Sequence, residues 1–244
     1  MIIKRLAEAI KHQSWFTVFI EVVTIVIGIF VGLQVDSWND RRLRQQNVEF
    51  QLARIEADAK SLRERLDRQI DLVYRQLELL VVTLSILDGE PLTDENRDEF
   101  MAGLQASYQQ RMVNLDIPSL QNLYESGEIE LIADDDVRNT LMAHLLERRT
   151  RDESFAHQRR IWDMNLEAVF EGFTFEFSEL DPESRTFRWD IAVDTDQLRE
   201  DIEFRRALGN VARMQDYTLS TLQGMRDSVG RVVIALETLS ESTE

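Results

Sequence analysis

The sequence contains no cysteine and only three histidines, at positions 12, 144 and 157. Without cysteine the chain can form no disulfide and perform no thiolate chemistry, which permits a location outside the cytoplasm without requiring one. The histidines show none of the H-E-x-x-H or Cys/His spacings that bind zinc. We therefore expect no metal site, and we interpret His12, His144 and His157 as ordinary surface or packing residues.

The sequence also lacks the short motifs that accompany common catalytic chemistry. It has no G-x-S-x-G, no glycine-rich phosphate-binding loop and no nucleophile with an evident base. The run Asp134, Asp135, Asp136 lacks the alternating ligands, central glycine and distal glutamate of a calcium loop, and helix capping accounts for it. We therefore predict that the protein is not an enzyme and uses no cofactor.

Positive charge is scarce and unevenly placed. The chain has 28 Lys and Arg against 45 Asp and Glu, for a net charge of −17. Residues 1–47 hold six basic and four acidic side chains, so they sum to +2 and the remainder sums to −19. A body this acidic repels nucleic acid, which predicts no nucleic-acid partner, whereas the basic flanks near the N-terminus suit lipid headgroups.

One long hydrophobic run interrupts this polar composition. Residues 15–35, WFTVFIEVVTIVIGIFVGLQV, carry a single charged side chain, Glu21, and about 20 apolar residues suffice to span the hydrocarbon core. Fourteen Phe, Ile, Val and Leu residues favour insertion by roughly 4 to 8 kcal/mol, against about 3 kcal/mol for one acid at the helix centre. The following GLQVDSW has no A-x-A-like cleavage site, so we predict an uncleaved transmembrane helix rather than a signal peptide.

Basic residues flank this run on both sides, so charge alone barely sets its orientation. Lys4, Arg5 and Lys11 precede it. A short basic N-terminus is hard to translocate, whereas a long acidic domain passes largely regardless of charge. We predict that the basic segment 1–14 stays inside and the body lies outside. Five residues around the span are predicted to lie at the membrane interface: Trp15, Trp38, Arg41, Arg42 and Arg44.

Small and polar residues within the run share one narrow face of the predicted helix, called here the stripe: Ser14, Thr17, Glu21, Thr24, Gly28 and Gly32, continued by Val35. G-x-x-x-G lets two backbones approach, and Ser, Thr or Glu side chains can hydrogen-bond across helices. Three interpretations stay open. Glu21 is merely tolerated, protonated or reaching towards the nearer interface; or the stripe is an oligomer interface in which Glu21 bonds a neighbour's Thr24 or Thr17; or Glu21 conducts ions or protons.

A long amphipathic helix is predicted after the span, because no proline or glycine occurs between Gly32 and Gly89. Apolar residues recur every seven positions, at Leu52, Ala59, Leu66, Val73, Leu80 and Leu87. Ile55 and Leu62 add coiled-coil-like spacing, and Ile70, Leu77 and Leu84 widen the face into that of a bundle helix. We predict this helix over residues 36–90, continuous with the transmembrane helix; two helices joined near Asp36 to Arg42 are the alternative.

The remaining residues, 91–244, are predicted to form an acidic helical body with one extended insertion. Helices are expected from a cap at Thr93 to about residue 112, from Pro118 to Gly127, from Asp135 to Glu171 behind a cap at Asp134, and from Asp194 or Thr195 to about Leu239. Residues 173–193 alternate in polarity, which predicts a β-hairpin turning at Asp181-Pro182-Glu183-Ser184.

The stretch IEVVTIVIGIFVGLQVDSWND resembles the N-terminal signature of an uncharacterised bacterial family of single-pass membrane-anchored proteins, a domain of unknown function. The resemblance lies in the spacing E-x6-G-x4-LQ-x3-WN, which begins at Glu21 and ends at Trp38-Asn39. More loosely, LYESGEIELI at 123–132 with Val137-Arg138, and DIEFR at 201–205, are similar to later family motifs. Asp36-Ser37 departs from the family's usual two asparagines. The resemblance implies architecture, anchoring and a place for Glu21 in the pattern, and it implies no activity.

These features predict a mainly α protein: one N-terminal transmembrane helix continuing into a long helix that packs in an elongated helical bundle, with a short β-hairpin near 173–193. We hypothesise a non-catalytic membrane-anchored scaffold or assembly subunit of the bacterial inner membrane, with a periplasmic body. It would contact membrane lipid and self-associate, or bind another membrane protein, through the stripe and the helix from Leu52 to Leu87. The alternatives are an ion- or proton-translocating or force-coupling component using Glu21, and an extracytoplasmic ligand sensor.

Overall fold

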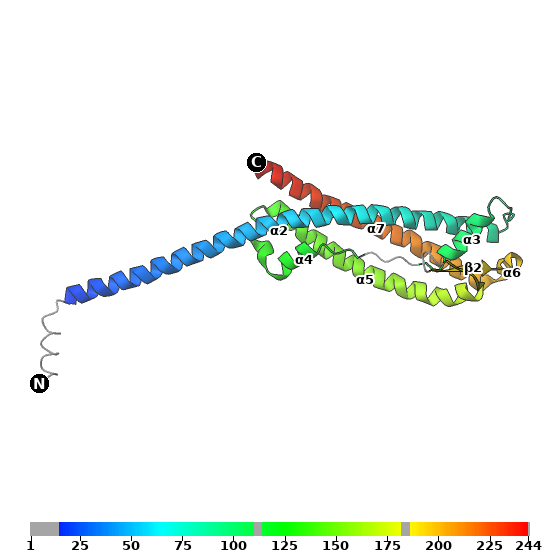
Figure 1. Cartoon of the computed structure of the whole chain (residues 1–244), viewed down its shortest axis with the longest axis horizontal. Helices are drawn as coiled ribbons and strands as arrows, with labels where there is room; N and C mark the ends of the chain where they lie inside the picture. Colours follow the sequence, from blue (N-terminus) through cyan, green and yellow to red (C-terminus); the bar gives the residue numbers. More distant parts are fainter. Residues whose placement is uncertain (1–14, 110–113, 182–185, 244) are drawn as a thin grey trace, which may run out of the picture. The chain divides into compact units, whose positions relative to one another are not determined.

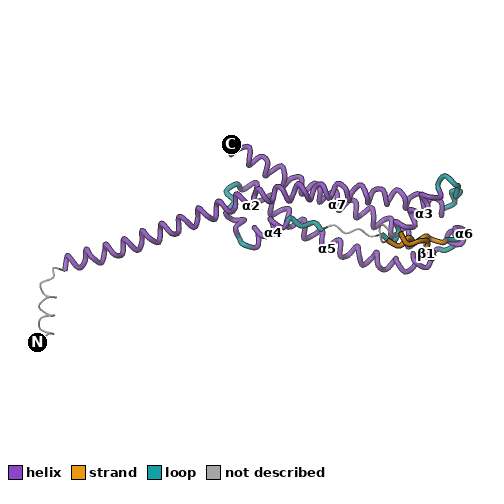
Figure 2. The backbone as a smooth tube through the Cα atoms, in the orientation of Figure 1, coloured by secondary structure: helices purple, strands orange, loops and turns teal. Residues whose placement is uncertain are grey.

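The computed structural model describes residues 15–109, 114–181 and 186–243. Its elements in chain order are α2 (Trp15–Leu87), α3 (Arg97–Ala106), α4 (Pro118–Glu125), the 3-10 helix η1 (Glu128–Leu131), α5 (Asp135–Glu171), β1 (Thr174–Asp181), β2 (Thr186–Ala192), α6 (Thr195–Glu200) and α7 (Ile202–Thr243) (Figure 1). Helices dominate the described chain, with one small sheet (Figure 2). The predicted mainly α fold with a long N-terminal helix is confirmed.

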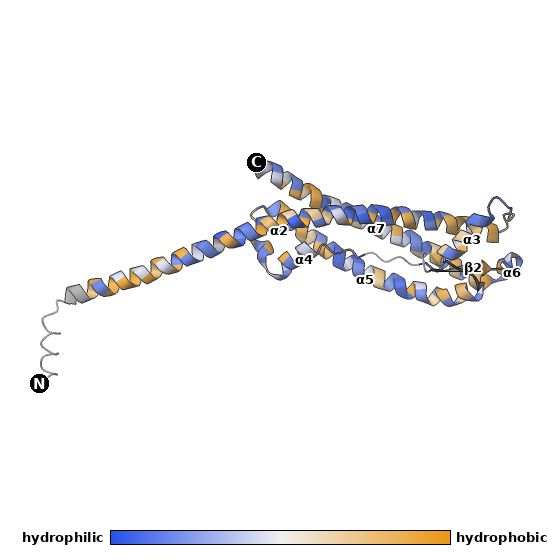
Figure 3. Ribbon diagram, in the orientation of Figure 1, coloured by the Kyte–Doolittle hydropathy of each residue, from blue (hydrophilic) through white to orange (hydrophobic). Residues whose placement is uncertain are grey.

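The chain divides into two compact units, Met1–Gln51 and Leu52–Glu244, which we call the N-terminal unit and the helical unit. Helix α2 belongs to both, and it is not broken near Asp36 to Arg42. Within the N-terminal unit every described side chain from Phe19 to Asp40 is exposed, and most are apolar (Figure 3). The helical unit holds nearly all of the buried apolar side chains.

Three long helices lie side by side in the helical unit: α5, α7 and the part of α2 that begins at Leu52 (Figure 1). Helix α7 runs antiparallel to α2, since Lys60 of α2 pairs with Glu237 at 2.8 Å and Asp67 with Arg226 at 3.7 Å. It also runs antiparallel to α5, since His144 contacts Ser228 and Asn165 contacts Asn210. The period-seven residues of α2 face inwards, with Ala59, Leu66 and Leu80 fully buried. The amphipathic pattern read from the sequence therefore marks the face that α2 buries in its own chain.

A core cluster of buried residues lies where the end of α2 meets α3, the hairpin and the start of α7. Trp162 and Val169 of α5, Leu198 of α6 and Phe204 of α7 are buried together there. Tyr108 and several phenylalanines add ring contacts, such as Phe173 with Phe204 at 6.4 Å between centroids. Aromatic residues bury large apolar areas, so this end contributes strongly to the stability of the unit.

The connection from α2 to α3 differs from the prediction. Helix α2 ends as expected at Leu87, and Gly89 has a φ of 122°, which residues other than glycine rarely adopt. Helix α3 starts at Arg97 rather than beside Thr93, because the Thr93 N–H donates to Asn96 Oδ1 at 2.8 Å and the Asn96 N–H donates to Thr93 Oγ1 at 3.4 Å. These two bonds hold residues 93–96 in a turn. The predicted helix end near residue 112 lies outside the described residues.

The middle of the chain follows the predicted signals. Pro118 begins α4, and Gly127 follows it with a φ of 74°. Asp134 caps α5, because its Oδ1 accepts a hydrogen bond from the Val137 N–H at 2.9 Å. Between α4 and α5 the chain forms η1, in which Ile129 is buried.

The predicted hairpin is present. Strands β1 and β2 pair antiparallel from Thr174 opposite Ala192 to Asp181 opposite Thr186, with an irregularity between Phe177 and Glu179. Residues 182–185, where most of the predicted turn lies, are outside the described residues.

The predicted single C-terminal helix is wrong, because it is two helices separated at Asp201. Asp201 has an extended ψ of 100°, and its Oδ1 accepts from the Phe204 N–H at 2.9 Å, as an N-cap does. The break lets Arg199 donate to the carbonyl oxygens of Ile86 at 3.1 Å, in the last turn of α2, and of Glu90 at 2.8 Å, just beyond it. The DIEFR segment thus has a structural role: a cap at Asp201, a buried Phe204 and an ion pair from Arg205 to Asp88.

Candidate functional site

The stripe lies on α2 within the N-terminal unit, and four of its six residues are described with their side chains. Ser14 lies outside the described residues, and the side chain of Thr17 is not described. A methyl group added to Gly28 or Gly32 would meet no atom within 4 Å. The Thr24 hydroxyl donates to the carbonyl of Ile20 in its own helix at 2.8 Å. Within the described residues, Glu21 makes no hydrogen bond or ion pair, so the stripe is an open face.

The residues expected at the membrane interface are described in part, since the side chains of Trp15 and Arg41 are not. Trp38 is exposed, and the Arg42 guanidinium carbon lies 5.9 Å from the centre of its ring, within cation–π range. Arg44 donates from Nε to the carbonyl of Asp40 at 3.4 Å. An exposed indole beside guanidinium groups is the pattern found at lipid headgroup level.

One helix, α2, is long and apolar enough to cross a membrane, judged by length and composition. None of its most apolar 18-residue stretch is buried. Leu33, for example, is 61% exposed, whereas Leu66 on the same helix is 0% exposed. An exposed apolar surface of this length is unfavourable in water and calls for another apolar environment.

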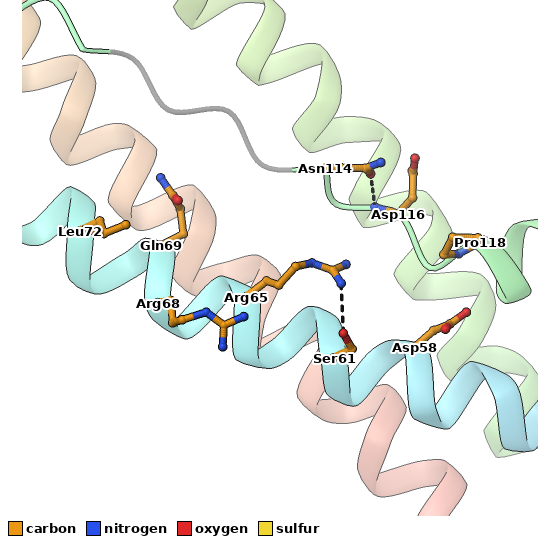
Figure 4. A pocket seen from close by; sticks show the side chains of 9 residues that line it. All are labelled: Asp58, Ser61, Arg65, Arg68, Gln69, Leu72, Asn114, Asp116 and Pro118. Atoms are coloured by element: carbon orange, nitrogen blue, oxygen red, sulfur yellow. Dashed lines mark hydrogen bonds between the residues drawn. The ribbon is translucent and has the colours of Figure 1, made fainter. Parts of the chain in front are cut away.

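The helical unit carries a groove between α2 and the segment that leads into α4, with a volume of about 630 Å³ (Figure 4). Its lining is mixed: Asp58, Ser61, Arg65, Arg68, Gln69, Leu72, Asn114, Asp116 and Pro118. Asp58 Oδ2 accepts from the Ser119 hydroxyl at 2.7 Å, and Asp116 pairs with Arg148 of α5 at 2.9 Å. The arginines have no such partner in the described chain, and Arg65 donates only to the Ser61 hydroxyl at 3.1 Å.

A ladder of polar residues crosses the interface between α5 and α7. On α5 its members are seven residues apart: His144, Arg151, Gln158 and Asn165. Each forms a hydrogen bond with α7. His144 bonds Ser228 at 3.1 Å, and Arg151 bonds the carbonyl of Thr221 at 3.2 Å. Gln158 bonds Thr218 at 3.0 Å, and Asn165 bonds Asn210 at 2.9 Å. Period-seven polar residues at a helix seam fix its register and partner orientation. This ladder was not predicted, although the seven-residue spacing of its α5 members is present in the sequence.

His144 is the most buried titratable member of the ladder. Burial lowers its pKa from 6.5 to about 4; the nearby Glu147 opposes this shift, and Arg148, Arg231 and Arg151 add to it. The ring is therefore neutral at physiological pH and shares a hydrogen bond with Ser228 through Nδ1. Its Nε2 is buried and has no partner within the described chain. The interpretation of His144 as a packing residue fits this geometry.

No group of three or more His, Asp or Glu side chains within residues 15–109, 114–181 and 186–243 is placed to hold a metal ion. Neither a protein-family profile, nor a curated protein, nor a solved structure matches the sequence. The resemblance of the N-terminal segment to a membrane-anchored family therefore stays a prediction, and the function must be argued from the molecule itself.

Proposed function

We propose that the protein is a non-catalytic, membrane-anchored scaffold or assembly subunit. A single observation carries this proposal: the apolar run of α2 is covered by no described part of the chain, while the helical unit buries a core of its own. A run of about 20 apolar residues is stable as an exposed helix only in a lipid bilayer or against another protein. We further propose anchoring in a bacterial inner membrane, which rests on the resemblance of the N-terminal segment, with the body in the periplasm, which rests on the short basic N-terminus.

Self-association is proposed to use the stripe. The period-seven face of the helix from Leu52 to Leu87 is already buried within its own unit, so it offers no apolar seam to a second copy. The stripe offers open space at Gly28 and Gly32, where a second helix backbone can approach closely. Small residues and interhelical hydrogen bonds are what drive helix association in lipid.

Glu21 is the side chain that we propose forms a hydrogen bond across this contact. The Thr24 hydroxyl already donates to Ile20, but its oxygen can still accept a hydrogen bond. A protonated Glu21 of a neighbouring copy can donate to that oxygen, whereas a carboxylate can only accept. We therefore propose a hydrogen bond between Glu21 of one copy and the Thr24 hydroxyl of a neighbouring copy.

The test is the mass of the protein in mild detergent, measured by light scattering. The 244-residue chain is compared with Glu21→Ala, with Gly28→Leu and with Ile29→Ala, a matched control for an exposed residue outside the stripe. We expect an oligomer that dissociates in Glu21→Ala and Gly28→Leu and persists in Ile29→Ala. A monomeric parent chain, or equal behaviour of all three variants, would rule out assembly through the stripe.

A proton-translocating role is the second candidate, because an unpaired acid within the span is its minimum requirement. It predicts proton flux into liposomes that is lost in Glu21→Gln. Flux equal to that of empty vesicles would rule it out without affecting the scaffold proposal.

A further inference from the structure

The groove on the helical unit has the composition of a binding site for an anion. It lies between α2 and the residues just before and at the start of α4, entirely within Leu52–Glu244 (Figure 4). Its volume of about 630 Å³ falls within the range of small-molecule sites. It is open to solvent, so a small ligand can reach it without any movement of a helix.

The acidic side chains of the groove are already compensated. Asp58 accepts two hydrogen bonds from Ser119, one from the hydroxyl at 2.7 Å and one from the backbone N–H at 3.4 Å. Asp116 forms an ion pair with Arg148 at 2.9 Å. Both carboxylates therefore have partners other than Arg65 and Arg68.

The basic side chains are uncompensated. Arg65 and Arg68 are three residues apart on α2, so they project from one face of the helix. Within the described chain neither makes an ion pair with a carboxylate, although acidic residues outnumber basic ones in the whole protein. Each guanidinium group can bind the paired oxygens of a carboxylate or phosphate in a bidentate manner.

Gln69 adds a third donor. Its Nε2 is buried and has no hydrogen-bond partner in the described structure, which is an unfavourable arrangement for an amide. Rotation of the amide group by half a turn exchanges its nitrogen and oxygen positions and presents the NH2 group to the groove. Leu72 and Pro118, both exposed, provide apolar surface beside these donors.

We propose that this groove binds a small organic oxyanion, with its carboxylate or phosphate held by Arg65, Arg68 and Gln69 and its carbon skeleton against Leu72 and Pro118. The site lies outside the apolar run, so it gives the helical unit a ligand-dependent role that is independent of anchoring. Binding there would join α2 to the segment that leads into α4, since both contribute to the lining.

Isothermal titration and thermal unfolding of the whole chain in detergent test the proposal, with inorganic phosphate and succinate as separate probes at constant ionic strength. The groove variant is Arg65→Gln with Arg68→Gln. Its matched control is Arg54→Gln with Arg63→Gln, which removes two exposed arginines of α2 that do not line the groove. Both pairs change the net charge equally.

We expect saturable binding of at least one probe with a rise in melting temperature, weakened roughly tenfold or more in the groove variant and unchanged in the control. Saturation by phosphate alone would identify a phosphoryl ligand, and saturation by succinate alone a carboxylate. Failure of both probes to saturate, or equal loss in the two double variants, would overturn the site. Neither result bears on the oligomer mass, so this proposal and the scaffold proposal fail separately.

Discussion

The two regions of α2 use apolar residues in opposite ways. From residue 19 to 35 the helix is apolar on nearly every side and its described side chains are all exposed. From residue 52 to 87 the same helix is apolar on one face, and that face is buried against α7 and the rest of the helical unit. Hydrophobic content alone therefore does not place a residue in a protein core. The angular distribution of apolar residues around the helix decides what covers them.

The largest expected effect comes from the same substitution made in each region. Leu66→Ala removes a fully buried side chain and should lower the free energy of unfolding by about 2–5 kcal/mol, because a cavity remains. Leu33→Ala removes a side chain that contacts no core and should change it by less than about 0.5 kcal/mol. Urea unfolding in detergent, followed by tryptophan fluorescence, measures both. Equal losses would mean that the apolar run packs on the helical unit after all.

Acid should destabilise the helical unit through His144. Its pKa is about 4 in the folded protein and 6.5 in the unfolded chain, so the unfolded state binds the proton more tightly. The stability is fully present above pH 6.5 and is lost as the pH falls towards 4, by on the order of 3 kcal/mol.

The measurement is urea unfolding at several pH values for the parent chain and for His144→Gln. The difference between the two should grow as the pH rises from 4 to 6.5 and then level off, since carboxylates contribute equally to both. His157→Gln, at an exposed position, serves as the control and should follow the parent. A parent and His144→Gln with parallel pH profiles would contradict the assignment.

A smaller contrast is expected between two helical glycines. A methyl group at Gly103 of α3 would collide with the Thr83 hydroxyl and the Leu79 carbonyl of α2, so Gly103→Ala should destabilise the unit by about 1–3 kcal/mol. Gly28→Ala meets open space and should leave the unfolding free energy within about 0.5 kcal/mol of the parent. Thermal unfolding distinguishes them, and a neutral Gly103→Ala would show that α3 does not pack closely on α2.

Local signals in the sequence were enough to predict several element boundaries. Asp134 caps α5 and Gly127 follows α4 because capping and positive φ depend on neighbours in the chain. The start of α3 and the break at Asp201 were not predicted. In each case a side chain accepts a backbone hydrogen bond that competes with continued helix: Asn96 accepts from the Thr93 N–H, and Asp201 accepts from the Phe204 N–H. The helix break at Asp201 is further stabilised by Arg199, which donates hydrogen bonds to the carbonyl groups of Ile86 and Glu90, more than a hundred residues earlier in the chain.

The sequence by itself indicated the helical class and the apolar run and favoured a continuous α2 over two helices, because each follows from residues adjacent in the chain or one helical turn apart. It also placed Glu21, Thr24, Gly28 and Gly32 on one face of that run. Only the tertiary structure decided that the period-seven face of α2 is buried within its own chain. The tertiary structure also placed Arg65 and Arg68 in one groove with Asn114 and Asp116, and it set His144 against Ser228. Those arrangements depend on which helices meet and in what register, and packing over long separations fixes both.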